Sequence, residues 1–314
     1  MDQRDLATIK KGTISLLRSE KGNIIVLFAF SMVLIFGMVG LVVDIGMVYK
    51  EKSDLKKIAT TAALSGAQEL PNGDPARVQD VVGTILSSYQ EQSSLQNLQI
   101  TMDQQVRVSL KKAVPLLFAK ILGFNSMTVQ ESATAKLDPI GRLLGVIPLG
   151  IDESTAITYG QTVSLKVGAG DSSTGNFGIL ALAGPGARTY GDTLKYGYDK
   201  IVSVGDVVPT QTGNIAGETQ DSVNYRINKC PNPSGDITVR NCDRIVPVIV
   251  YKTNSSNGQV IDSITVTGFA FFYLLDPMSS KDTSINGEFI ERVDIGTYEA
   301  GSLNRGAYMA RLVE

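Results

Sequence analysis

The feature that most constrains this chain is a run of 20 uncharged residues from Ile24 to Val43, in which Ser31 is the only hydroxyl. A helix of that length rises about 30 Å, which matches the hydrocarbon core of a bilayer. A buried core helix is the alternative, but soluble helices this long normally keep a polar face. The sequence therefore predicts one transmembrane helix, to which we assign residues 22–48.

A cleavable signal peptide is the competing interpretation of this run. Its apolar region usually spans about 7–15 residues, and a small-residue cleavage site follows at once. Here the run is longer, charged Lys50 and Glu51 follow it, and the small residues 65–67 lie far beyond. We therefore expect a retained anchor. Lys and Arg number five in residues 1–21 and four in residues 49–69, so charge alone encodes the orientation poorly.

The composition excludes most familiar catalytic chemistry. The chain has no His, which removes Ser–His and Cys–His hydrolases, zincins and most transition-metal sites. Two Cys cannot build a Cys-rich zinc or iron–sulfur site. With 29 Lys and Arg against 31 Asp and Glu, there is no basic footprint for nucleic acid. We expect no catalytic residues, no metal and no cofactor, and a protein that is not an enzyme.

Helical spacing continues beyond the apolar run, from Tyr49 to Leu70, and Pro71-Asn72-Gly73 then ends the helix. One face of this segment is made of small residues that permit close backbone approach: Ala59, Ala62, Ala63, Gly66 and Ala67. The face either packs on the chain's own ectodomain, which we favour, or docks on a partner helix.

Asp44 is the first charged residue after the apolar run. One interpretation is a polar contact with a partner helix inside the membrane. The other, which its place at the end of the span favours, is a boundary carboxylate solvated by lipid headgroups.

Several motifs of the N-terminal region occur in a fixed order: Ser19–Asn23 (SEKGN), the apolar run, Val43–Gly46 (VDIG) and Ala59–Ala67 (ATTAALSGA). Over residues 17–70 this order resembles the N-terminal region of TadG-like proteins of Flp-pilus (tight adherence) assembly, which are related to the TadE minor pseudopilins. The resemblance extends more loosely to Leu116–Gly123 and Val129–Ala135, as a short amphipathic helix followed by a strand.

The resemblance implies a component of a pilus or secretion apparatus in the cell envelope, with a cytoplasmic N-terminus and the bulk of the chain outside. Two positions depart from the family pattern. Thr60 stands where the alanine block usually has Asp, and Leu27 stands where processed pilin-like relatives have Glu. The second departure favours a leader that is retained rather than cleaved after Gly22.

Composition changes after about residue 138. Short β-branched or alternating runs bounded by turn residues appear at 156–167, 201–208, 244–252, 263–275 and 289–298, with Asn257-Gly258 as a hairpin signal. We predict an α+β chain whose last domain is a β-rich sandwich or open barrel. Its parts are a cytoplasmic leader (1–21), the transmembrane helix (22–48), a mixed α/β segment (49–138) and the β-rich extracytoplasmic domain (139–314).

Three elements are expected in the mixed segment: a helix over residues 76–89, a strand over 98–110, and a short amphipathic helix over 114–122. The last could lie on a membrane surface, but we favour packing on the core.

Cys230 and Cys242 enclose eleven residues that include two Pro and one Gly. Outside the cytoplasm they should form a disulfide that closes a loop, because a metal site would lack two further ligands. The glycine-rich runs Gly168–Gly175 and Ala183–Arg188 fit surface turns better than phosphate or metal loops.

The leading hypothesis is a non-enzymatic structural component of a Flp-type pilus or envelope assembly machine, in the cell membrane. Its partners would be other assembly proteins, contacted through helix packing and the ectodomain. The alternative is a membrane-tethered surface protein that binds a wall polymer or an adhesion ligand.

Overall fold

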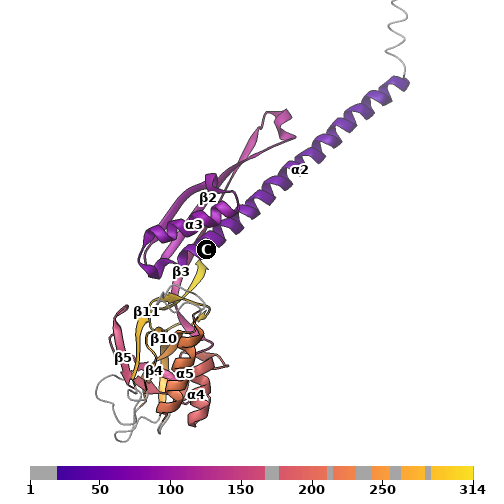
Figure 1. Ribbon diagram of the computed structural model, residues 1–314. Coiled ribbons are helices and arrows are strands. Elements are labelled where there is room, and N and C mark those ends of the chain that lie inside the picture. Colours follow the sequence, from indigo (N-terminus) through magenta and orange to yellow (C-terminus); the bar gives the residue numbers. More distant parts are fainter. Residues whose placement is uncertain are drawn as a thin grey trace, which may run out of the picture. The chain divides into compact units, whose positions relative to one another are not determined.

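The computed structural model describes residues 20–166, 177–210, 215–230, 242–254, 263–279 and 284–313 (Figure 1). These residues form two compact units. Unit 1 contains residues 20–59, Ser93–Gln96 and Ser109–Ser132, and unit 2 contains Thr60–Gln92, Asn97–Val108 and the described residues from Ala133 onward. A long apolar helix precedes a β-rich region with two sheets, so the predicted α+β class is confirmed.

The helix α2 runs without a break from Glu20 to Ala67. From Ile24 to Val43 every residue except Gly40 is exposed, whereas buried residues recur from Leu55 onward. By length and composition α2 is the one helix among the described residues that could cross a membrane. A 3₁₀ turn, η1 (Leu70–Asn72), follows, and Gly73 ends it in the left-handed conformation with φ of 70°.

In unit 1, the predicted amphipathic helix over residues 114–122 is wrong. Strand β2 (Gln105–Pro115) continues to Pro115, a 3₁₀ turn η3 (Ala119–Leu122) follows, and β3 (Ser126–Leu143) returns. A residue before proline is biased away from the helical region, which favours an extended Val114. The apolar side chains of the turn are mostly exposed, so they do not pack on a core as expected.

In unit 2, helix α3 (Pro75–Ser88) confirms the helix expected at residues 76–89. Asp74 caps it by accepting a hydrogen bond of 2.9 Å from the amide of Ala76, and Pro75 occupies the first turn, where its missing N–H costs nothing. Val78, Val82 and Leu86 form the buried face of this helix.

The first sheet has the order β1-β2-β3-β14-β12, and two short strands also pair with β3. Its other members are β1 (Leu95–Thr101), β12 (Arg292–Val293), β14 (Ala307–Val313), β13 (Thr297–Tyr298) and β7 (Val202–Ser203). The single strand expected over residues 98–110 is therefore wrong. A turn through Asp103, which has a φ of 58°, divides that segment into β1 and β2.

The second sheet lies entirely in unit 2, with the order β5-β11-β10-β9-β4-β6 and β8 paired to β10. These strands are β4 (Leu149–Asp152), β5 (Thr162–Lys166), β6 (Phe177–Ile179), β8 (Val207–Pro209), β9 (Ile245–Thr253), β10 (Ser263–Leu274) and β11 (Ser284–Ile290). Strands β9 and β10 are antiparallel, as the hairpin prediction requires. Asn257-Gly258 itself lies outside the described residues.

Two helices that the sequence analysis did not predict, α4 (Ala187–Tyr196) and α5 (Ala216–Lys229), cover one face of the second sheet (Figure 1). Tyr190 and Ile227 from the helices join one core with Phe272 of β10. Phe271 and Tyr273 point to the opposite face, into a second core. Strand β10 is therefore buried on both faces, because helices lie on one side of it and other strands on the other.

Candidate functional site

The candidate anchor is the apolar run of α2, residues 24–43. Its large apolar side chains are exposed; Leu34 and Phe36, for example, are each 66% exposed. A water-soluble protein would not leave a contiguous apolar surface of this size uncovered. This exposure indicates that the segment is solvated by lipid, which supports membrane anchoring.

Asp44 has an environment that neither sequence interpretation described. Its side chain is only 3% exposed. One carboxylate oxygen accepts a hydrogen bond from the amide of Leu117 (2.8 Å), and the other accepts from Phe118 (3.0 Å) and Ala119 (2.7 Å). The carboxylate thus binds the loop between β2 and β3 within unit 1, instead of standing free among lipid headgroups.

Gly40, one helical turn before Asp44, makes this approach possible. A Cβ built on Gly40 would lie 2.5 Å from ring carbons of Phe118, closer than real side chains come. The sequence signal for this contact was a glycine and an aspartate four residues apart, which places both on one face of α2. What the sequence could not give was their partner, because the loop lies more than 70 residues away along the chain.

Charged pairs connect α2 to the same hairpin farther from the apolar run. Lys112 Nζ lies 2.5 Å from Glu51 Oε1, and Lys52 Nζ lies 3.6 Å from Glu131 Oε1. Such partly exposed pairs contribute little stability individually, but they fix which residues of hairpin and helix face one another.

The small-residue face lies mostly in unit 2, where Ala62, Ala63 and Ala67 are fully buried; Ala59, which belongs to unit 1, is fully buried too. A Cβ built on Gly66 would meet Val82 at 2.9 Å, and Val78 and Val106 at 3.4 Å. At Gly66 the face is therefore occupied by α3 and β2 of the same chain.

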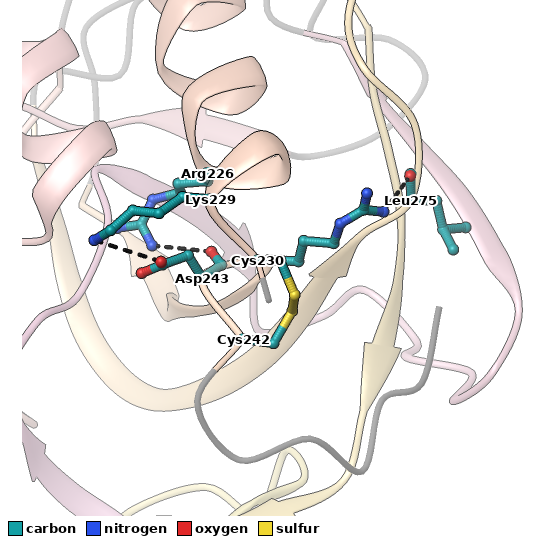
Figure 2. The surroundings of a disulfide bond; sticks show 7 residues. Arg226, Lys229, Cys230, Cys242, Asp243 and Leu275 are labelled. Atoms are coloured by element: carbon teal, nitrogen blue, oxygen red, sulfur yellow. Dashed lines mark hydrogen bonds and ion pairs between the residues drawn. A yellow bond between two sulfur atoms is a disulfide. The ribbon is translucent and has the colours of Figure 1, made fainter. Parts of the chain in front are cut away.

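Cys230 and Cys242 form a disulfide with an S–S distance of 2.01 Å (Figure 2). It joins the end of α5 to the segment before β9. Beside it, Lys229 Nζ lies 3.4 Å from Asp243 Oδ2, and Arg226 donates hydrogen bonds to the carbonyls of Leu194 (2.6 Å) and Asp243 (3.2 Å). Burial lowers the pKa of Arg226 to about 10, so its guanidinium stays charged at neutral pH.

A cavity of about 420 Å³ opens near the disulfide, lined in part by Tyr196, Arg226, Arg292 and Ile295. Its cationic groups already have partners, since Arg226 binds carbonyls and Arg292 Nε lies 3.2 Å from Asp294 Oδ2. Within the described ranges, no cluster of acidic or Cys side chains could hold a metal ion.

The two glycine-rich runs have different outcomes. Gly168–Gly175 lies outside the described residues. Ala183–Gly186 forms turns, and α4 begins at Ala187, so the second run includes a helix start that the sequence analysis did not predict.

The predicted site residues thus have three separate sets of neighbours: the β2–β3 loop for Asp44, α3 and β2 for Gly66, and α5 with the start of β9 for the Cys pair. Comparison with curated proteins gave no match, and comparison with solved structures gave none. Residues 22–69 match the family model described as "Putative Flp pilus-assembly TadE/G-like". The matched residues include the whole apolar run, Asp44 and the small-residue face, so the similarity of this chain to TadE/G-like pilus-assembly proteins lies in its N-terminal region.

Proposed function

We propose that this protein is a non-enzymatic, membrane-anchored structural component of a Flp/Tad-type pilus or secretion assembly apparatus. The observation that carries the proposal is the match of residues 22–69 to the TadE/G-like family, over the same residues whose apolar side chains are exposed on α2. The sequence has no His, the side chain used most often for general acid–base catalysis, which fits a non-enzymatic role.

In this proposal, the leader (1–21) is cytoplasmic, residues 22–48 cross the cell membrane, and the mixed segment (49–138) and the β-rich domain (139–314) are extracytoplasmic. The disulfide supports this orientation, since disulfides persist in oxidising compartments and are rare in the cytosol. The helix α2 would pack laterally against pilin-like helices of other assembly proteins. The β-rich domain would provide further protein contacts.

Crosslinking in native membranes tests this function. A photoreactive amino acid at Val42, which is 68% exposed on α2, should crosslink to pilins or other assembly proteins that mass spectrometry identifies. The same variant without irradiation is the control. Irradiated membranes that yield only lipid adducts, or partners unrelated to pilus assembly, would contradict the proposal.

A second candidate function, binding of a surface polymer, is favoured by one observation. Tyr196, which is 64% exposed, lines the cavity near the disulfide, and exposed aromatic rings offer both an apolar face and a polar group to a ligand. Polymer pull-down with the full chain in detergent, compared with a Tyr196→Ala variant, tests it. Equal retention of the two variants, or none, would remove the cavity from consideration.

A further inference from the structure

The loop between β2 and β3, taken together with the first two residues of β3 (residues 116–127), is unusual because its exposed side chains are apolar. We name it the apolar loop. Ile121 is 85% exposed, and five more apolar side chains are at least 43% exposed: Leu117, Phe118, Leu122, Phe124 and Met127. By contrast, the turn between β1 and β2 centres on Asp103. Contiguous exposed apolar side chains mark a surface that meets something other than water.

The apolar loop contacts α2 at a level inside the apolar run. The ring of Phe118 lies against Gly40, and the carboxylate of Asp44 accepts hydrogen bonds from the amides of residues 117–119. Gly40 lies three residues before the end of the run at Val43, which is about 4.5 Å along the helix axis. If residues 24–43 are solvated by lipid, the loop beside Gly40 is at the depth of the outer part of that lipid.

Polarity changes at the same level on the helix and on the hairpin. The pairs Glu51–Lys112 and Lys52–Glu131 join them seven and eight residues beyond Asp44, which is about 10–12 Å along the axis. Both elements are therefore apolar beside Gly40 and charged beside Glu51. A bilayer boundary imposes this shared change, whereas a loop that bound a separate protein would not need to match the helix.

The hydrogen bonds of Asp44 meet a requirement that lipid imposes. A 3₁₀ turn leaves its first amides without partners inside the turn, and in hydrocarbon no water is present to pair them. Asp44 pairs the amides of Phe118 and Ala119 at the start of the turn, together with the amide of Leu117 just before it. Lys120, the one charged residue of the loop, is exposed and can extend its ammonium to the headgroups while its stem stays in the apolar layer.

We propose that the apolar loop inserts into the lipid bilayer beside α2, on the side of the membrane that holds the β-rich domain. The protein is then attached at two points, a spanning helix and a shallow loop, in the manner of interfacial apolar segments. This inference rests on the membrane anchor in the proposed function. It adds a second lipid contact that sets how deeply α2 and the hairpin sit in the bilayer.

The absence of Trp from the chain permits a direct test, because any introduced Trp is the only one. The full chain is reconstituted in phosphatidylcholine vesicles as three single-Trp variants: Ile121→Trp in the apolar loop, Leu34→Trp in the middle of the span, and Ile295→Trp, a position that is 91% exposed in unit 2. Brominated phosphatidylcholine, with bromine placed near the headgroup or near the chain ends, quenches Trp in contact with it.

The proposal expects Ile121→Trp to show blue-shifted emission and to lose more intensity to the shallow bromine than to the deep one. Leu34→Trp should respond most to the deep bromine, and Ile295→Trp to neither. Emission of Ile121→Trp that equals that of Ile295→Trp, while Leu34→Trp is quenched, would overturn the insertion but leave the anchor intact. An unquenched Leu34→Trp would contradict the anchor and hence the proposed function.

A second set of variants guards against a folding defect caused by Trp at position 121. Emission of Phe124→Trp should also be quenched by the shallow bromine. Adding Ile121→Asp and Leu122→Asp to this Phe124→Trp variant should abolish the quenching while the chain stays in the membrane. A response that survives both aspartates would overturn the proposal, since a charged loop could not remain in lipid.

Discussion

The first half of α2 (residues 24–43) and its second half (residues 55–67) belong to one continuous helix, but they differ in which side chains are exposed. In residues 24–43 the large apolar side chains point outward and only Gly40 is buried. In residues 55–67 the buried side chains are mostly alanines, and Lys56 and Lys57 are exposed. The same helical backbone is therefore compatible with lipid around the first part and with water and protein around the second. Large apolar side chains are exposed where the surroundings are lipid and buried where they are water.

The difference also teaches how the halves hold their neighbours. Beside the first half, a carboxylate and a glycine bind a loop through polar contacts and close approach. In the second half, small residues allow α3 to approach, so that dispersion contacts accumulate over the helix. Substitutions in one half therefore leave the contacts of the other half in place, and we expect their effects on free energy to differ.

The largest effect should come from making the first half polar. The double variant Val33→Arg with Leu34→Arg places two charges at the middle of the span, at a cost of about 5–7 kcal/mol on insertion scales. We expect the chain to lose stable integration and to appear in the soluble fraction after carbonate extraction. Val33→Leu with Leu34→Ile is the matched control and should stay in the membrane.

The disulfide of the β-rich domain comes next, and it reports on the compartment that holds this domain. Replacing both Cys230 and Cys242 with Ala should lower the free energy of unfolding by about 3 kcal/mol, because a closed loop of this length restricts the unfolded chain. Thermal unfolding in detergent, with and without reductant, measures it. Reductant should destabilise the native chain but not the variant. Two free thiols in the native chain isolated from cells would contradict an extracytoplasmic location.

At the junction of the two halves, Asp44→Asn removes one acceptor oxygen from the three amides. Loss of a hydrogen bond to a charged group costs about 1.5–3 kcal/mol, so exchange of the amides of Leu117, Phe118 and Ala119 should accelerate about 10–100-fold. Hydrogen exchange of the chain in detergent measures this. Asp54→Asn is the control, because Asp54 pairs with exposed Lys50 on the same helix; it should leave the three amides unchanged.

The smallest change concerns the second half alone. Gly66→Leu forces a side chain into a space where a Cβ already meets Val82 at 2.9 Å, and overpacking of this kind costs about 1–3 kcal/mol. The melting temperature should fall. Gly83→Ala, on α3, has nothing within 4 Å of its Cβ and should raise stability by up to about 1 kcal/mol through helix propensity. A Gly66→Leu variant with unchanged melting would show that α3 can retreat from this face.

The sequence predicted two helices correctly from their apolar residues. The apolar run gave α2, and the apolar spacing of Val78, Val82 and Leu86 gave α3. Helices α4 and α5 were missed because their buried faces contain Tyr190, Thr193, Thr219 and Ser222, which do not form an apolar stripe. Some of their hydroxyls find partners only in the fold, as when Ser222 Oγ donates to the carbonyl of Gly191 (2.9 Å).

At Asp44 and the apolar loop, too, the sequence did not show which residues would be partners in the fold. Asp44 stood out in the sequence because it ends an uncharged run. The backbone amides that donate hydrogen bonds to it are present in every non-proline residue, so no sequence pattern identifies them. The apolar loop was visible as apolar residues, yet exposure is a tertiary property, and Leu117 and Ile121 could equally have been core residues until β2 was seen to extend through Pro115.

Strand β14 has a consequence for the order in which this protein can be assembled. It pairs with β3 from Tyr308 opposite Pro139 to Val313 opposite Thr134, and Arg311 forms an ion pair with Asp138 across the two strands. Until residues 307–313 have been synthesised, that edge of β3 stays open for about 170 residues of further synthesis. The first sheet therefore has a free edge during synthesis, which pairing of the last strand closes.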